Sequence, residues 1–566
     1  MTSPLQKTGR RAAVVGASAM VAAGLAVGGC SSGPAATSAD CTASGSSSPV
    51  AASSPVAASS PLPAGSSHAA AGWTLPGADL ANTRDVASAI NSSDVSRLGV
   101  AWCVPLTADN AGFGNYATTP VVLNGVVYTQ DLQSNVMAIK LATGKVLWTH
   151  TYNSRNGGPD GVNVAGGVVY AATGSAAVAL DAATGKQVWS RTLTANRYEG
   201  VDMTPGYDHG TVYVSTVPVN ASTGVEYGGG GKAVLWALEA QTGAPEWKWD
   251  EVQDLWGNPY INSGGGQWYA PAFDAQGNLY LGVANPGPLA GAPGYPWGTS
   301  RPGPDLYTDS VVKLSPRGKL LWYYQLTPHD LYDWDLQDPP VLTTAHGRPV
   351  VIDGGKAGIL IELDARTGKL LWKRPVGVHN GHDLDGLLTQ HAAPTSRLPL
   401  PAQVDVEPGA FGGIETQLAS NGSVTFAAVN DLPVVFKSES GPYFPSLAAL
   451  GTALVKATGE MVAVNQDTGT VEWDTRLPST PYGAATVTND VVFTTTFNGY
   501  LDAFDAATGK ILLSKPLSAG TNAPVTVDGD YVIAGADVPA PDTQQQELII
   551  AYRLGAKGTL PVTVGP

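Results

Sequence analysis

The chain has 566 residues, of which 14% are charged, and its 46 acidic side chains outnumber its 31 basic ones. This acidic balance, with no cluster of lysine and arginine beyond the N-terminus, argues against nucleic acid as a partner. The counts of 68 glycines, 14 tryptophans and 21 tyrosines favour turns and short aromatic-rich strands over long helices, so the composition predicts an all-β protein.

Residues 1–29 have the features of an export signal. A basic segment that contains Lys7, Arg10 and Arg11 precedes an uncharged run of small and apolar residues, which ends at "VGGC". This pattern resembles a lipoprotein signal peptide and predicts lipidation of Cys30. We therefore expect an exported protein, lipid-anchored at the outer face of the cytoplasmic membrane or in the periplasm. A twin-arginine signal and an uncleaved transmembrane anchor are the alternatives.

Residues 30–72 are rich in Ser, Ala and Pro and include the tandem "SSPVAASSPVAASSP". Such a segment cannot bury enough apolar area to offset its ordering entropy, so we expect a flexible tether, and contact with the membrane only through the lipid. Cys41 lies in this tether, which leaves a disulfide bond to Cys103 open. None of the three cysteines stands in CxxC or CxxCH spacing, which disfavours a thiolate zinc site and a covalently attached c-type haem.

Beyond Trp73 one pattern recurs along the chain. It consists of a short apolar strand, a turn of the D-x-x-T-G type and a second strand that ends in Trp, as in "LIELDARTGKLLW". The turn residues are specific, because Asp and Thr bond their own backbone and Gly accepts a positive φ. Seven copies end at Trp148, Trp189, Trp247, Trp322, Trp372, Trp473 and Leu513.

Alternating strands such as "NGVVYTQ" and "NDVVFTTT" precede most copies, so each unit supplies about four short antiparallel strands. One unit cannot bury both of its faces, and radial stacking solves this. We therefore predict an eight-bladed β-propeller over residues 73–566. "LGVAWCVPL" near residue 100 and "ELIIAYRLG" near residue 550 would share the eighth blade and close the ring. A long solenoid is the alternative.

Four segments in different repeats carry polar residues that a plain propeller does not need. They are "TGVEYGGG" with Glu226, "LGVANPGP" with Asn285, "TPHDLYDWD" with Asp333 and Asp335, and "DGGKAGILIELD" with Lys356. Closure of the ring could bring them together near its axis, where carboxylate and amide oxygens suit a hard cation. A cation beside a base is one hypothesis. Solvated charges and turn caps are the alternative for each residue taken singly.

The stretch "PDLYTDSVVKLSPRGKLLWYYQLTPHDLYDWDLQDPPVL" resembles the catalytic segment of the pyrroloquinoline quinone (PQQ)-dependent, or quinoprotein, alcohol dehydrogenases. A weaker similarity at the level of the repeats extends from about residue 95 to 555. The resemblance implies an eight-bladed propeller that holds a quinone and a metal ion on its axis. It also implies that Glu226, Asn285 and Asp333 are metal ligands and that Asp333 is the catalytic base. Asp335 matches the extra carboxylate of the lanthanide-using branch.

The resemblance also implies three cofactor contacts. Lys356 falls where the family has a basic residue on the quinone carbonyls, and Trp268 in "GGGQWYAPAFD" matches the indole on which the cofactor lies. Asn430 in "FAAVNDLP" is similar to a further contact. The implied reaction is oxidation of a small alcohol or sugar-like substrate by hydride transfer to PQQ, assisted by calcium or a lanthanide ion, with a separate electron acceptor.

The sequence departs from the family at two places near the expected cofactor. Asp160 occupies the approximate place of an arginine that meets a cofactor carboxylate, and Ala117 stands where the family often has Glu. An acid that faces the carboxylates of PQQ would repel them, which counts against PQQ binding. The paired adjacent cysteines of the family are absent as well. The second hypothesis is therefore a non-catalytic propeller lipoprotein that acts as an envelope assembly or interaction scaffold.

Overall fold

The computed structural model describes residues 72–106, 114–218, 229–444, 447–538 and 545–561. In these ranges the regular secondary structure is mainly short antiparallel strands, as the composition predicted, and the helices are α1 (Asp385–Thr389), α2 (Leu447–Lys456) and the 3₁₀ turns η1 (Val95–Arg97) and η2 (Asp254–Gly257). No helix in the described ranges is long and apolar enough to cross a membrane. The predicted signal peptide, the lipidation site Cys30 and nearly all of the predicted tether lie outside the described residues.

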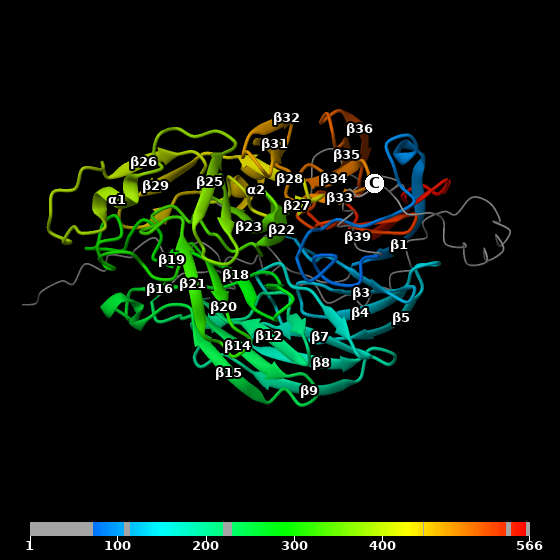
Figure 1. Ribbon diagram of the computed structural model, residues 1–566, viewed down its shortest axis with the longest axis horizontal. Coiled ribbons are helices and arrows are strands. Elements are labelled where there is room, and N and C mark those ends of the chain that lie inside the picture. Colours follow the sequence, from blue (N-terminus) through cyan, green and yellow to red (C-terminus); the bar gives the residue numbers. More distant parts are fainter. Residues whose placement is uncertain (1–71, 107–113, 219–228, 445–446, 539–544, 562–566) are drawn as a thin grey trace, which may run out of the picture.

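The strands form eight four-stranded antiparallel sheets within the described ranges, arranged in a propeller-like fold (Figure 1). The first four sheets are β2 (Val121–Leu123), β3 (Val126–Gln130), β4 (Val136–Lys140) and β5 (Val146–His150); β6 (Asn163–Ala165), β7 (Val168–Thr173), β8 (Ala176–Asp181) and β9 (Gln187–Thr192); β11 (Gly206–Asp208), β12 (Thr211–Ser215), β14 (Val234–Glu239) and β15 (Pro245–Asp250); and β17 (Ala272–Phe273), β18 (Leu279–Val283), β20 (Ser310–Leu314) and β21 (Leu320–Gln325).

The next three sheets are β22 (Val341–Ala345), β23 (Arg348–Gly355), β24 (Ile359–Asp364) and β25 (Leu370–Pro375); β27 (Ala419–Ser420), β28 (Val424–Asp431), β31 (Thr458–Asn465) and β32 (Val471–Leu477); and β33 (Thr486–Thr488), β34 (Val491–Thr496), β35 (Tyr500–Asp505) and β36 (Ile511–Pro516). The last sheet joins the two ends of the chain, because β1 (Leu98–Pro105) pairs with β39 (Leu548–Leu554), next to β38 (Tyr531–Ala536) and β37 (Thr526–Asp528). This is the pairing that the sequence predicted.

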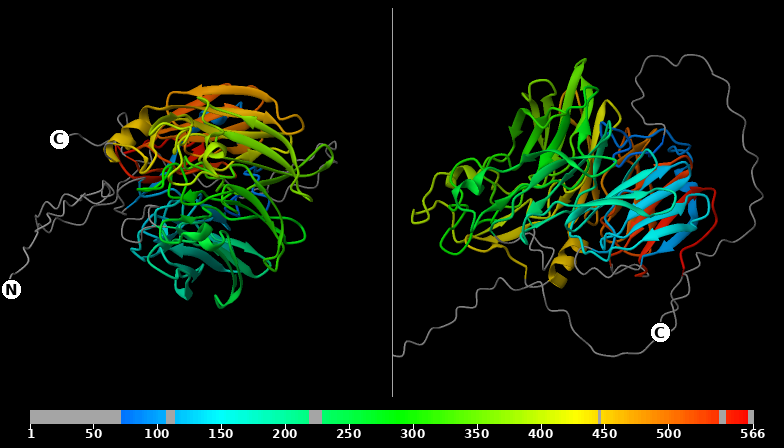
Figure 2. Two further views of the ribbon diagram at one scale, coloured as in Figure 1. Left: turned by 90° about the vertical axis from the view of Figure 1, so that its left-hand side faces the viewer. Right: turned by 90° about the horizontal axis from the view of Figure 1, so that it is seen from below.

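Three smaller sheets lie in the connections. They are β10 (Glu199–Gly200) with β13 (Val217–Pro218), β16 (Ser263–Gly264) with β19 (Pro286–Gly287), and β26 (Gln403–Val406), β29 (Val434–Lys437) and β30 (Gly441–Pro442). Figures 1 and 2 show that the last of these and α1 lie to one side, beyond the sheet of β22 to β25. The long insertion between Trp372 and Trp473 thus adds a subdomain and leaves the repeating sheets intact.

The recurring turn and its tryptophan interlock neighbouring sheets. In the turn after β24, Asp364 accepts hydrogen bonds from the backbone and the hydroxyl of Thr367, at 2.9 and 2.7 Å. Gly368 follows at φ +70°, and a Cβ atom there would lie 2.6 Å from the ring of Trp322, in the preceding sheet. The indole of Trp322 donates to the carbonyl of Ala365 at 3.2 Å. Glycine is therefore needed both for the turn and for the close approach of the ring.

The same tryptophan–glycine contact joins each sheet to the next along the chain. The pairs are Trp102–Gly144, Trp148–Gly185, Trp189–Gly243, Trp247–Gly318, Trp322–Gly368, Trp372–Gly469 and Trp473–Gly509. In β36 the series has Leu513 in place of Trp, and Lys515 of the same strand donates to the carbonyl of Leu98 at 3.0 Å. The repeat read from the sequence is thus a contact between sheets rather than a feature of each sheet alone.

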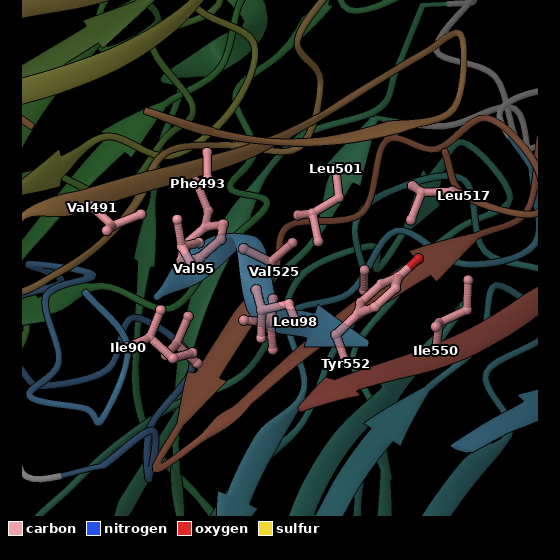
Figure 3. Packing of buried hydrophobic residues seen from close by; sticks show 14 of the residues in the cluster. Ile90, Val95, Leu98, Val491, Phe493, Leu501, Leu517, Val525, Ile550 and Tyr552 are labelled. Carbon is pink, nitrogen blue, oxygen red and sulfur yellow. The ribbon is translucent and has the colours of Figure 1, made fainter. Parts of the chain in front are cut away.

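Hydrophobic side chains fill the space between the sheets. The largest core cluster joins residues of the N-terminal segment, such as Ile90 and Leu98, to Phe493 and Tyr552 near the C-terminus (Figure 3). Cys103 in β1 is disulfide-bonded, and the other two cysteines of the chain lie outside the described residues. The ends of the chain are therefore held together by packing as well as by the pairing of β1 with β39.

Residues 72–86, here called the N-terminal strap, run across the first strands of several sheets. Carbonyl groups of the strap accept hydrogen bonds from the backbone of Val122, Phe273, Leu342, Ser420 and Val487, which belong to or flank β2, β17, β22, β27 and β33. Arg84 in the strap is fully buried. Its guanidinium group donates to the carbonyls of Ala485 and Val525 and to the side chains of Gln417, Thr486 and Thr119. One arginine thus ties together segments from four sheets.

Candidate functional site

The acidic loop between β21 and β22 folds around Asp330. The Asp330 carboxylate accepts hydrogen bonds from the backbone of Tyr332 and Trp334, at 2.8 and 2.9 Å. Between them Asp333 adopts a positive φ of 65°, which is uncommon for a residue with a side chain. The loop therefore holds Asp333 in one conformation. Its neighbour Asp335 accepts the backbone N–H of Asn285 at 2.6 Å, which joins the loop to the segment after β18.

Lys356 joins the two acids of this loop. It follows β23, and its ammonium group lies 2.6 Å from Asp335 Oδ2 and 3.3 Å from Asp333 Oδ2. The same ammonium group lies 5.0 Å from the centre of the Trp268 ring, within the range of a cation–π contact. Asn285, Asp333, Asp335, Lys356 and Trp268, which the sequence singled out from four separate segments, therefore lie together.

Of the two remaining predicted site residues, the structure describes one. Asn430 lies in β28, where its backbone pairs with Gly413 at 2.8 and 2.9 Å. Gly413 in turn packs against the backbone of Lys356, so Asn430 is joined to the lysine segment through the backbone of Gly413. The Oδ1 atom of Asn430 is buried and accepts no hydrogen bond within the described ranges. Glu226, the remaining predicted metal ligand, lies outside the described residues.

At this site burial and the nearby opposite charges shift the pKa values of the side chains in opposite directions. Burial raises the pKa of Asp333 well above its usual range, and the charge of Lys356 opposes this rise. Burial acts to lower the pKa of Lys356, but the charges of Asp333, Asp335 and Glu415 outweigh it and raise that pKa well above its usual range. The lysine is therefore protonated at neutral pH, and its positive charge favours the ionised form of the acids beside it.

The structure adds residues that the sequence did not single out. Glu415 is buried near Lys356 and accepts a hydrogen bond from the Tyr482 hydroxyl at 3.2 Å. Burial raises the pKa of Glu415 to about 7, while Lys356 acts to lower it. The segment "FGGIETQ" contains only this one acid, and such an isolated residue resembles an ordinary polar loop position. Its place in the loop before β27, two residues after the glycine pair, is the available signal.

On another side of Trp268, two more acids are buried. The backbone N–H of Thr204 donates to the Trp268 carbonyl at 3.0 Å, and the Thr204 hydroxyl donates to the Asp160 carbonyl at 3.1 Å. Asp202 lies two residues before Thr204 and is 7% exposed, and Asp160 is fully buried. Thr204 therefore links the backbone of Asp160 to the backbone of Trp268. Ala117, the other departure from the family, is buried beside Thr118 in the loop before β2.

The side chains at this site suit a hard cation and a flat anionic ring. Asp333 Oδ1 is a buried acceptor without a hydrogen-bond partner in the described ranges, and Asp335, two residues on, accepts the backbone N–H of Asn285. Among the described residues, no group of three or more His, Cys, Asp or Glu side chains has the geometry of a preformed metal site. The indole of Trp268 with the Lys356 ammonium group over it offers a flat face and a positive charge. These residues fit a planar quinone and, in part, a cation.

Comparison with known proteins identifies relatives of this chain. Residues 73–163 and 207–417, more than half of the chain, match the family model described as "Glucose/ethanol/alcohol dehydrogenase, beta-propeller domain". Residues 132–271 and 436–552 match a second model, described as "Outer membrane protein assembly factor BamB". The two matches overlap over residues 132–163 and 207–271.

Individual relatives agree with the first family. The chain is 28% identical over 535 residues to a quinohemoprotein alcohol dehydrogenase from Comamonas testosteroni, covering 82% of this chain and 71% of the relative. It is 26% identical to the quinohemoprotein alcohol dehydrogenase ADH IIB from Pseudomonas putida, covering 83% of this chain and 76% of the relative.

Solved structures show the same fold. The crystal structure of the quinohemoprotein alcohol dehydrogenase from Comamonas testosteroni has a TM-score of 0.72 at 25% identity, and the match covers 87% of this chain and 82% of that one. A europium-containing methanol dehydrogenase has a TM-score of 0.67 at 19% identity over 86% of this chain and 98% of that one, which shows the fold alone. The chain therefore belongs to the glucose/ethanol/alcohol dehydrogenase β-propeller family, the family of the PQQ-dependent alcohol dehydrogenases.

Proposed function

We propose that the protein is an exported, lipid-anchored quinoprotein dehydrogenase that oxidises an alcohol or sugar-like substrate. The observation that carries this proposal is the arrangement around Lys356, which contacts Asp333 and Asp335 and lies over the Trp268 ring. It combines a base, a positive charge and a flat platform in one buried place. The related alcohol dehydrogenases support the assignment of the reaction class. Electrons would leave to a separate acceptor.

The residues that would hold the cofactors follow from this arrangement. Trp268 would lie against the rings of PQQ, and Lys356 would contact its carbonyl oxygens, with Asn430 behind it. Asn285, Asp333 and Asp335, together with Glu226, would bind calcium or a lanthanide ion, since hard cations prefer carboxylate and amide oxygens. When bound, PQQ supplies the acceptor for the hydride of the substrate.

The side chains of this chain would perform the remaining steps. Asp333, fixed by its loop and by Lys356, would accept the proton of the substrate hydroxyl. Lys356 keeps positive charge beside the acid and so favours the carboxylate form that a base requires. Burial of Asp333 and Lys356 keeps bulk water away from the reacting atoms, which strengthens both effects.

We further infer that the eight sheets are the blades of one closed propeller. The tryptophan–glycine contacts between successive sheets support this arrangement, and so does the bond from Lys515 to Leu98 between the seventh sheet and the last. The hydroxyl of Thr526, in β37, donates to the Pro120 carbonyl just before β2, at 2.7 Å. A closed ring would place the loops that carry Asn285, Asp333 and Lys356 around a common axis.

The test is dye-linked oxidation of short alcohols after addition of PQQ with Ca²⁺ or La³⁺. We expect turnover by the wild type and a loss of at least about 100-fold in Asp333→Asn, which cannot accept the proton. The matched control is Asp405→Asn on an exposed position of β26, which should retain full activity. Equal turnover in Asp333→Asn and the wild type would exclude Asp333 as the base.

A second candidate function is an assembly or interaction scaffold at the cell envelope. The match of residues 132–271 and 436–552 to the assembly-factor model favours it. The same assay separates the two candidates. Absence of turnover, together with a melting temperature that neither PQQ nor metal raises, would favour the scaffold.

A further inference from the structure

A buried ion pair lies against the acidic loop between β21 and β22. Arg301 and Asp305 belong to the connection between β19 and β20, and the guanidinium group of Arg301 donates to the Asp305 carboxylate. Both side chains are fully buried. The cost of removing two charges from water offsets most of their attraction, so such a pair adds little to stability by itself. The groups that the pair contacts therefore indicate its role.

Arg301 joins the two segments that carry the proposed metal ligands. Its Nη2 atom donates to the carbonyl of Asp330 at 2.5 Å and to that of Pro288 at 3.3 Å. Asp330 lies three residues before Asp333, and Pro288 lies three residues after Asn285. The planar guanidinium group thus presents donors to both segments at once and in a fixed geometry.

Asp305 contacts the two residues that precede Asp330. Its backbone N–H donates to the Pro328 carbonyl at 2.8 Å, and its Oδ2 atom lies 3.1 Å from Nδ1 of His329. The His329 side chain is fully buried. The ion pair therefore contacts three consecutive residues, 328–330, on one side of the acidic loop.

The carboxylate of Asp330 extends these contacts to Asp333. Its two oxygens accept the backbone N–H groups of Tyr332 and Trp334, the residues on either side of Asp333. The φ of Asp333, between these two bonds, is 65°. A positive φ is uncommon for a residue with a side chain and persists where the surrounding contacts enforce it. A continuous series of contacts therefore runs from the ion pair to both neighbours of Asp333.

We propose that Arg301 and Asp305 are positioning residues, which hold Asp333 and Asn285 in the geometry that turnover requires. The inference rests on the proposed function, because it takes Asp333 as the base. Both residues act through the backbone of the acidic loop rather than on the substrate. A displacement of about 1 Å at a reacting group can cost about 100-fold in rate. Loss of the pair should therefore lower kcat, with little change in KM.

The variant that tests this role is the double substitution Arg301→Met with Asp305→Leu. It removes both charges together, so no unpaired charge remains in the interior, and it leaves the backbone bond from residue 305 to Pro328. Replacement of a buried ion pair by apolar side chains of similar size is often neutral for stability, so we expect a melting temperature within about 5 °C of the wild type. A pair with a structural role alone would then leave kcat unchanged.

Two measurements are made on the full chain. The first is dye-linked alcohol oxidation with PQQ and Ca²⁺, in which we expect kcat of the double variant to fall at least about tenfold and KM to change less than about threefold. The second is hydrogen–deuterium exchange of residues 331–335 without cofactor, where the amides of Tyr332 and Trp334 should exchange at least about tenfold faster. The matched control is Arg553→Met with Asp530→Leu, which removes a pair of 2.8 Å from the surface of the last sheet and should behave as the wild type.

A further variant covers the case in which the double variant does not fold. Arg301→Lys keeps a positive charge beside Asp305, but its ammonium group lacks the fork that reaches both carbonyls, so its kcat should also fall. In that case, kcat of Arg301→Lys at the level of the wild type would overturn the inference.

Three other results contradict the proposal. Wild-type kcat in the folded double variant would leave the ion pair with a structural role alone. A lower kcat with unchanged exchange of residues 331–335 would also overturn the inference, because the loss would not come from the acidic loop. Absence of turnover in the wild type removes the proposed function, and the exchange measurement then decides by itself whether the pair orders the loop. Unchanged exchange would refute that as well.

Discussion

Replacement of the buried arginine of the N-terminal strap tests how the sheets are held together. Arg84→Met keeps a side chain of similar length but removes all of its donors. Three of the bonds lost are short, to Ala485 at 2.7 Å, Gln417 at 2.8 Å and Thr486 at 2.7 Å. A bond from a charged donor contributes about 2–3 kcal/mol, and its acceptor remains buried and unpaired after the substitution.

An opposing effect reduces this loss. Burial lowers the pKa of Arg84 to about 9, so the folded state disfavours the charge by about 5 kcal/mol, and methionine relieves that cost. The difference is a net loss of about 3 kcal/mol. Unfolding of a domain of this size carries an entropy of about 1 kcal/mol/K, so the melting temperature should fall by about 3 °C.

The assay is differential scanning calorimetry of Arg84→Met beside Arg553→Met. Arg553 is 49% exposed at its side chain and pairs with Asp530 at 2.8 Å on the surface, so its loss should change the melting temperature by less than about 1 °C. If the two variants have the same melting temperature, the hydrogen bonds of Arg84 do not stabilise the contacts between the sheets, and the assigned role of the strap is wrong.

Three further predictions concern single sites. Asp537→Asn should match the wild type in stability near pH 4 and exceed it near pH 9 by several kcal/mol in urea titrations. The reason is that burial raises the folded-state pKa of Asp537 to about 8, so the wild type loses stability as the pH rises from about 4 to about 8; equal slopes of stability against pH would contradict this. Gly368→Ala should lower the free energy of unfolding by about 2 kcal/mol more than Gly347→Ala does, because both glycines have φ near +70° but only Gly368 contacts a tryptophan ring. Equal losses of stability in thermal melts would show that this contact has no role. Trp268→Ala should weaken PQQ binding about tenfold by fluorescence titration with Lys356 in place, and unchanged affinity would place the quinone elsewhere.

The sequence predicted the repeating unit because its causes are local. The D-x-x-T-G turn bonds within itself, as Asp364 and Thr367 do, and alternating residues define each strand. The pairing of β1 with β39 could be predicted too, because an incomplete sheet at each end of the chain has one evident partner. The contact of each tryptophan with the glycine of the next sheet was not predicted, since it depends on the distance between sheets.

The site residues were predicted from polar segments or, for Trp268 and Asn430, from the family resemblance alone. Asp333 and Asp335 stand out in an acidic loop, and Lys356 follows a glycine pair. Glu415 and Asp202 are single acids in mild surroundings, and only the fold brings them near Lys356 and Trp268. Arg84 was missed for the same reason. The acceptors of its guanidinium group lie 35 to 441 positions away in the sequence, so no local pattern separates it from a surface charge.

The pairing of β1 with β39 has a consequence for biosynthesis. β1 is the first strand of the described ranges and its partner β39 is the last, so the ribosome makes the two strands far apart in time. The final sheet therefore forms only after the whole chain has been synthesised. A chain with this arrangement leaves β1 without its partner strand until β39 has been made.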